Sequence, residues 1–175
     1  MTEETSVNLN PDAGAPQQNQ QFGLQRIYLK DASFEMPLGA AAFTQQWEPK
    51  INLDLNTKNV QLDEKLFEVT LSLTISATIG EEAKTAFLVE VHQAGIFVAD
   101  GFDPQTLHQT LGIVCPNIIF PYAREAVDNL VTRGSFPALL LAPVNFEALY
   151  VQAMRQAAAK QQTQAQAAET EAPAE

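Results

Sequence analysis

The stretch "FEVTLSLTISATI", from Phe67 to Ile79, decides the fold that we expect for this chain. Apolar residues occupy every second position from Phe67 onward, and the positions between them are Glu, Thr or Ser. Successive side chains of a strand point to opposite faces of the sheet, so this spacing predicts a long strand with one buried and one wetter face.

Two further strands surround this segment. The acidic turn "GEEAK" follows at once, and Thr85 to Gln93 then returns as a second strand, which predicts an antiparallel hairpin. Upstream, the apolar residues of "INLDLN" alternate in the same way from Ile51 to Asn56. This segment therefore predicts a third strand.

A fourth strand is indicated by "QRIYLKDASFE", residues 25–35, but its alternation is interrupted. The residues expected to face inward change parity along the segment: Ile27 and Leu29, then Ala32 and Phe34. One extra residue in the strand, a β-bulge near Lys30 and Asp31, would account for the change.

Helical signals dominate the second half of the chain. Asp103 and Pro104 have the chemistry of an N-cap and a first-turn proline, which predicts a short helix through about residue 112. Pro121 is expected near the first turn of a helix that runs to Arg133, with Gly134 as its left-handed stop.

The segment "FPALLLAPVNF" contains two prolines and is expected to be an extended connector. From Asn145 onward, apolar residues recur at steps of three and four and predict one apolar stripe on a last helix. They are Phe146, Leu149, Tyr150, Ala153 and Met154.

Strands followed by helices predict an α+β domain, a four-stranded antiparallel sheet with helices packed on one face. Such a sheet leaves its other face to water or to partners. A chain of 175 residues, 46% of them hydrophobic, suits a single core. We expect this domain to span residues 23–158, after a disordered arm over residues 1–22. A flexible acidic tail is expected over residues 159–175, where alanine and glutamine could extend a helix for a few turns.

The net charge of −11, from 21 acidic against 10 basic residues, repels phosphate backbones and anionic lipid. This argues against nucleic acid and membrane surfaces as partners and favours a basic protein. No apolar run approaches the roughly 20 residues of a membrane-spanning helix. The start "MTEETSVNLN" lacks the features of a secretory signal, so we expect a soluble, cytoplasmic protein.

Cys115, the single cysteine, is a candidate nucleophile because a position before a helix N-terminus lowers a thiol pKa. Pro116 argues against this role, since it has no N–H to donate to an oxyanion. The alternative, a small buried apolar residue, is favoured.

No cofactor or metal site is expected. His92, His108 and Cys115 have none of the paired spacings of zinc ligands, and the chain carries neither a Walker phosphate loop nor G-x-G-x-x-G.

In "FLVEVHQ", strand parity places Leu88, Glu90 and His92 on one face and Phe87, Val89, Val91 and Gln93 on the other. If the second set faces the helices, Leu88 lies on the open face of the sheet beside Glu90. That placement is consistent either with ordinary surface or with docking of a basic partner.

Aromatic and apolar residues also gather outside the strands, in "AAFTQQWEP" and in "GSFPALLLAPVNF". They either close the core or line grooves for extended peptide, because such grooves have apolar and aromatic walls.

Five segments resemble the SecB protein-export chaperone family in order and spacing over about residues 25–150. They are "QRIYLKDASFE", W-x-P at Trp47 to Pro49, "FLVEVHQAGIF", "LGIVCPNIIFPYARE" and "RGSFPALLLAPVNFEALY". The resemblance implies a homotetramer, a dimer of dimers with helices between two eight-stranded sheets. It also implies an ATP-independent holdase that binds non-native precursor proteins in apolar grooves and delivers them to the SecA motor ATPase.

The resemblance assigns roles to three sets of positions. The SecA-docking residues would be Asp31, Glu35, Leu88 and Glu90. The client groove would include Trp47, Ile51, Leu53 and Leu55. Tetramer assembly would be supported by Val89, Val91 and Gln93.

Two alternatives differ in function. A SecB-like chaperone of a toxin–antitoxin system would keep the fold and guard one unstable client. A small cysteine hydrolase would depend on Cys115.

Overall fold

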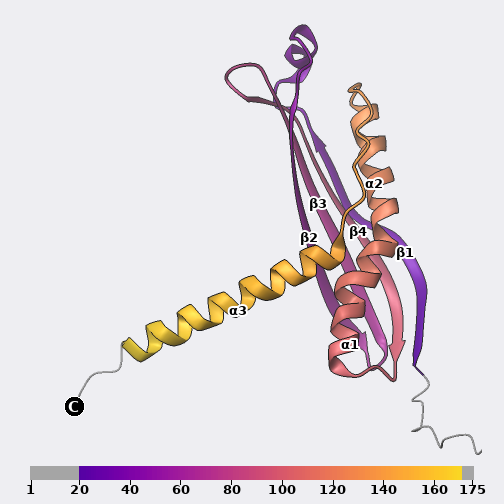
Figure 1. The fold of residues 1–175 in the computed structure, drawn as a ribbon. Coiled ribbons are helices and arrows are strands. Elements are labelled where there is room, and N and C mark those ends of the chain that lie inside the picture. Colours follow the sequence, from indigo (N-terminus) through magenta and orange to yellow (C-terminus); the bar gives the residue numbers. More distant parts are fainter. Residues whose placement is uncertain (1–19, 171–175) are drawn as a thin grey trace, which may run out of the picture.

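The computed structural model describes residues 20–170, with side-chain surroundings through residue 159. Four strands form one antiparallel sheet in the order β1-β4-β3-β2, so β1 and β2 are its edges (Figure 1). Their bounds are β1 Gln21–Glu35, β2 Lys50–Asp63, β3 Leu66–Ile79 and β4 Lys84–Asp100. The alternating stretch is β3 and pairs on both sides, which confirms the strand expected there.

The bulge expected in β1 is present. Leu29 lies opposite Gln93, and Asp31, two residues on, lies opposite His92, so Lys30 is the extra residue. A second irregularity lies between Leu24 and Arg26. The two shifts let β1 keep its apolar side chains toward the helices despite the broken alternation.

The first helix begins where the sequence predicts it. Asp103 caps α1 (Pro104–Gln109), and its carboxylate accepts hydrogen bonds from the backbone N–H groups of Gln105 and Thr106. Hydrogen bonding from Thr106, first from its side chain and then from its backbone, followed by that from Gln105, holds the pKa of Asp103 below its ordinary value.

The helix start expected at Pro121 is wrong. A π-helical turn, η2 (Thr110–Val114), joins α1 directly to α2 (Cys115–Arg133), and Pro121 lies inside α2. In the wider turn, the N–H of Cys115 bonds to the carbonyl of Thr110, five residues back. Pro116 lies just after this turn and has no N–H to donate, so it would leave a gap in the hydrogen bonds of a regular α-helix.

The left-handed stop predicted at Gly134 is also wrong, because its φ is −73°. Ser135 takes the positive φ instead, 64°. Glycine is needed at 134 for a different reason: a Cβ there would overlap the ring of Phe34. The residue lets the end of α2 lie close against β1.

After a turn at Gly134 and Ser135, residues 136–145 form neither helix nor strand, in line with the predicted connector, and α3 (Phe146–Thr170) then leads away from the sheet (Figure 1). A short 3-10 helix, η1 (Gly39–Thr44), follows β1. The stripe predicted on α3 is buried only at its start: Phe146 is 2% exposed, whereas Met154 is 50% exposed.

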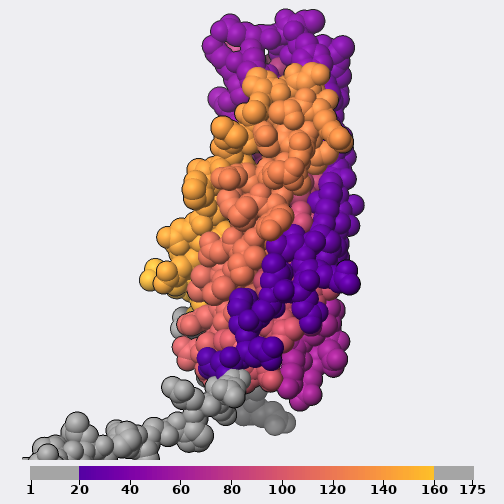
Figure 2. All heavy atoms as spheres, turned by 90° about the vertical axis from the view of Figure 1, so that its right-hand side faces the viewer, coloured from indigo at the N-terminus to yellow at the C-terminus, as the bar shows by residue number. Residues whose placement is uncertain are grey.

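The core lies between the sheet and α2. The inward residues of β3 and β4 are almost fully buried, among them Val69, Leu71, Ile75 and Val89. Figure 2 shows the salmon-to-orange run of α1 and α2 covering this side of the molecule beside the indigo strand β1. Among the described residues, no helix covers the sheet face opposite α2, and we call it the open face.

The arm expected through residue 22 ends earlier, because β1 begins at Gln21 and the ring of Phe22 stacks on Phe97, with centroids 5.8 Å apart. Residues 1–19 of the arm lie outside the described residues. At the other end, the backbone of α3 continues to Thr170, and residues 171–175 of the expected tail again lie outside. Within the described part of the chain, no helix is both long and apolar enough to cross a membrane.

Candidate functional site

The open face brings together the four residues predicted to dock SecA. Cross-strand pairing places Glu35 opposite Leu88 and Asp31 opposite His92, and Glu90 lies in the row between them. Paired residues of an antiparallel ladder share a face, so these side chains form one patch. On the next strand, the residues opposite Leu88, Glu90 and His92 are all small and hydroxylated: Ser76, Thr74 and Ser72. The patch is therefore flat on that side.

The structure adds Asp54 to these carboxylates. Asp54 lies opposite Thr74, which lies opposite Glu90, so both acids occupy one row of the open face. We call Asp31, Glu35, Asp54 and Glu90 the acidic patch. The ion pairs found among the described residues, Lys30–Glu68, Lys65–Asp100 and Lys84–Glu82, all lie elsewhere. Asp54 was not among the predicted docking residues. Its alternation with Leu53 and Leu55 along the strand nevertheless indicated that it faces the other side of the sheet.

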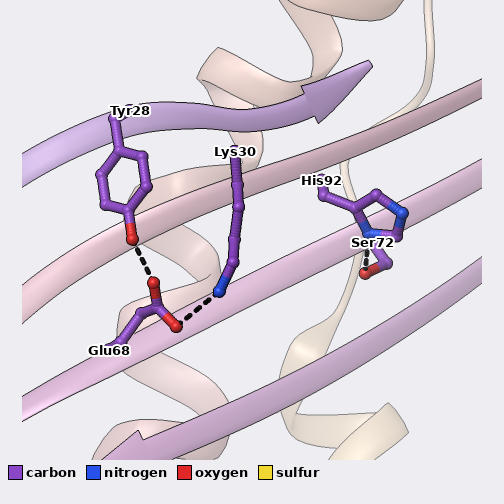
Figure 3. A network of polar contacts seen from close by, with 5 residues as sticks. All are labelled: Tyr28, Lys30, Glu68, Ser72 and His92. Carbon is purple, nitrogen blue, oxygen red and sulfur yellow. Dashed lines mark hydrogen bonds and ion pairs between the residues drawn. The ribbon is translucent and has the colours of Figure 1, made fainter. Parts of the chain in front are cut away.

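Beyond the bulge, the open face carries a polar network centred on Glu68 (Figure 3). The Tyr28 hydroxyl donates to one oxygen of Glu68, and Lys30 Nζ lies 2.7 Å from the other. The Lys30 hydrogen bond, followed by that from Tyr28, holds the pKa of Glu68 below its ordinary value, while the bond to Glu68 raises the pKa of Tyr28. Next to the network, His92 Nδ1 and Ser72 Oγ lie 2.6 Å apart.

On the helix-covered side, the two aromatic segments meet at one end of the sheet. Trp47 packs on Phe136 with ring centroids 5.0 Å apart, and Phe43 lies 5.2 Å from the same ring. Phe87 of β4 and Phe34 of β1 complete this aromatic cluster. Phe43 is 53% exposed, so part of the cluster faces solvent.

The other predicted groove residues continue from this cluster along β2. Ile51, Leu53 and Leu55 pair with the buried residues of β3 and share their face. However, Ile51 and Leu53 remain 40% and 38% exposed. The packing of α2 explains this, because it contacts β4, β3 and β1 and leaves the β2 edge uncovered. Trp47, Ile51, Leu53 and Leu55 thus follow one another on an apolar surface, which we call the apolar strip.

Below the strip, Leu55 lines a pocket of about 380 Å³ together with His108, Gly112, Tyr150 and Met154. The Tyr150 hydroxyl lies 2.6 Å from Nδ1 of His108. This contact joins α3 to α1 at the floor of the pocket, and it involves a histidine for which the sequence suggested no partner.

Val89, Val91 and Gln93 lie beneath α2 and are 0%, 0% and 5% exposed. They have almost no surface to offer another subunit. Their predicted role in assembly stays a prediction, and any such effect has to act through the packing of α2.

The hydrolase alternative is not supported by the position of Cys115. The residue lies inside a continuous helical run rather than before a helix N-terminus, and it is 0% exposed. Burial raises the pKa of its thiol to about 12, so the thiol is protonated at neutral pH. His92 and His108 bond to Ser72 and Tyr150 instead. Within the described residues, no group of three His, Cys, Asp or Glu side chains is placed so that it could hold a metal ion.

Comparisons with known proteins agree with this architecture. The family model described as preprotein translocase subunit SecB matches residues 15–157. A protein of Hahella chejuensis named protein-export protein SecB is 52% identical over 160 residues, covering 91% of this chain and 99% of the relative. A protein of the same name from Pseudomonas syringae is 56% identical over 147 residues, covering 83% of this chain and 90% of the relative.

Among solved structures, a SecB-like chaperone of Mycobacterium tuberculosis in complex with an antitoxin peptide superposes with a TM-score of 0.57. The match covers 70% of this chain and 90% of the solved chain. At 16% identity, it shows the similarity of the fold alone. The family match extends over more than half of the chain, and the relatives named above are more than half identical to it. The chain therefore belongs to the SecB family.

Proposed function

We propose that this protein is an ATP-independent holdase that binds non-native precursor proteins on the apolar strip and its aromatic cluster. The observation that carries the proposal is that Ile51 and Leu53 stay about two-fifths exposed beside the buried inward residues of β3. Contiguous exposed apolar surface on a soluble protein is typical of a binding site. The strip is also flanked by an edge strand, which suits an extended chain.

The affinity per strip should be modest. Burial of apolar surface contributes about 25 cal/mol per Å², and ordering an unfolded client opposes it. In the homotetramer that we propose, a dimer of dimers, several strips act on one client through effective concentration. Weak contacts at several sites hold a client and still release it.

We further propose that the acidic patch docks the SecA motor ATPase and that the protein acts in the cytoplasm. Four carboxylates on a flat face, none of them in the ion pairs described above, suit a basic docking element. Asp31, Glu35 and Glu90 would supply charge, and Leu88 would supply an apolar contact between them.

An export role is preferred to the guarding of an antitoxin. The relatives at 52% and 56% identity are named protein-export proteins, whereas the neighbour bound to an antitoxin peptide is 16% identical. That neighbour does support peptide binding by this fold.

Leu53→Asp tests the holdase proposal. The substitution places a charge in the middle of the strip, at a half-exposed site where it need not disturb the core. We expect suppression of client aggregation to fall about tenfold, since each client would have to desolvate a carboxylate. Aggregation of an unfolded precursor, followed by light scattering, measures this.

The matched control is Asn52→Asp, which adds the same charge one residue away on the open face. It should leave holdase activity nearly unchanged. Equal activity of Leu53→Asp and the unmodified protein, at the same mass in solution, would remove the strip as the client site.

A further inference from the structure

The open face is divided into two halves of opposite charge, and the bulge in β1 marks the boundary. The acidic patch lies on one side, with Lys50 at its outer end. On the other side, Arg26 lies opposite Ile96 and Lys58 lies opposite Thr70, in rows of the same face as Glu68. We call Arg26, Lys30 and Lys58 the cationic half. The bulge leaves Lys30 bonded to Glu68 while its neighbour Asp31 lies opposite His92.

The cationic half keeps an excess of positive charge. Arg26, Lys30 and Lys58 face the carboxylate of Glu68. Asp63, which lies opposite Leu66, adds one more negative charge to this half, and Lys65 and Asp100 pair with each other, so the local sum is +1. Glu68 is 12% exposed and already bonds to Lys30 and Tyr28, which leaves Arg26 and Lys58 exposed to solvent. A positive region of this kind runs against the chain's net charge of −11.

On the face of a single chain, a partner of ordinary size on the acidic patch also reaches the cationic half. Strands about 4.8 Å apart make the face about 19 Å wide, and the 14 residues of β3 make it about 48 Å long, or about 900 Å². An ordinary interface buries about 800 Å² per partner. The rows of Glu90 and Ala94, which represent the two halves, are only about 13 Å apart.

A uniformly basic partner would therefore meet repulsion over part of its footprint. We propose that the partner docked on the acidic patch also presents an acidic segment to Arg26 and Lys58, so that the open face fixes the direction in which the partner binds. The inference rests on the proposed docking of SecA and adds the second contact and the orientation.

The test is a charge swap on β2. Asp54 and Lys58 are both exposed, share the open face and lie four residues apart. Asp54→Lys combined with Lys58→Asp keeps the net charge but reverses the local polarity. We expect at least a tenfold loss of affinity for purified SecA, measured by calorimetry at low and high salt. Lys58→Glu alone should weaken binding about threefold to tenfold at low salt.

Arg155→Glu is the matched control for Lys58→Glu. It makes the same change of charge at an exposed position of α3, away from the sheet. It should bind as the unmodified protein does. Arg26→Glu repeats the test on β1, and melting curves with the mass in solution identify any variant that is misfolded. Unchanged affinity of the swap, or tighter binding by Lys58→Glu, overturns the inference.

Failure of the docking proposal itself gives a different result. Glu90→Lys should abolish most SecA binding if the acidic patch docks the motor at all. If Glu90→Lys binds normally, or if the unmodified protein does not bind SecA, the docking proposal fails and the inference fails with it. Loss of binding in Glu90→Lys together with normal binding in the swap overturns the inference alone.

Discussion

At the scale of single residues, Glu68 shows how the sheet keeps a carboxylate charged on a crowded face. Its side chain is 12% exposed, and each of its oxygens has a donor, Tyr28 or Lys30. A carboxylate with two donors is stabilised in its charged form. The lowered pKa of Glu68 thus links this network to the pH dependence of folding.

Glu68→Gln is expected to lower the free energy of unfolding by about 1–2 kcal/mol at neutral pH, because it weakens two hydrogen bonds to a charged acceptor. The folded-state pKa lies below 4.5, so the charged form contributes stability above the unfolded-state pKa. This contribution disappears as the pH falls through the folded-state pKa. Urea unfolding over a range of pH measures the difference between the two proteins.

The difference in the free energy of unfolding between the unmodified protein and Glu68→Gln should therefore be constant near neutral pH and become smaller in acid. A gap that persists unchanged below the folded-state pKa would mean that Glu68 acts through packing rather than charge. Ser76→Ala, on the same face, is the control that changes no titratable group.

At the scale of elements, the strands were predictable, whereas the junction between the first two helices was not. Alternation is a local property, so β3 and the bulge at Lys30 follow from the residues themselves. The π-helical turn has no comparable pattern, and Pro121 has the appearance of a helix start although it lies within α2. The role of Gly134 depends on Phe34, which is distant in sequence. Contacts of that kind emerge only when the chain folds.

The same distinction holds for the candidate site. Parity within β4 was enough to place Leu88 and Glu90 on the open face, and pairing with β1 then added Asp31 and Glu35. Parity within β2 was enough to place Asp54 on the open face, but its position in the row of Glu90 depended on the register between β2 and β3, which the sequence does not specify. Exposure of Ile51 and Leu53 depended on where α2 packs.

The π-helical turn also seats α3. A Cβ on Gly112 would lie 2.7 Å from Cδ2 of Tyr150, so the ring packs directly on the glycine backbone. We expect Gly112→Ala to displace Tyr150, break its contact with His108 and raise amide hydrogen exchange in the first turns of α3 at least tenfold. Exchange monitored by mass spectrometry measures this.

Tyr150→Phe separates the two parts of this contact. It removes the hydroxyl bonded to His108 and keeps the ring on Gly112, so it should cost only about 0.5–1.5 kcal/mol. Equal exchange in Gly112→Ala and the unmodified protein would show that α3 is held by Phe146 alone.

At the scale of the whole molecule, assembly depends on surfaces that one chain leaves open. In the part of the chain that the structure describes, each edge strand pairs with one neighbour only, and Leu24 and Leu29 of β1 are 43% and 52% exposed. Long edges with apolar side chains favour pairing between subunits. The buried positions under α2 would then affect assembly indirectly.

Val91→Ala is expected to destabilise the protein by about 2 kcal/mol, because it leaves a cavity under α2. If Val91 supports the proposed tetramer through α2, the mass by light scattering should fall toward that of a dimer on dilution. Val98→Ala, on the same strand but on the open face, is the matched control. If both variants lower the mass equally, the effect of Val91 on assembly does not act through the packing of α2.

The aromatic cluster has a practical consequence. Trp47 is the only tryptophan of the chain, and its indole packs on Phe136 and Phe87 at one end of the apolar strip. Indole emission responds to the polarity around the ring, and only one ring contributes. The fluorescence of the unlabelled protein is thus a built-in reporter of this end of the strip, able to register the arrival and departure of a client in real time.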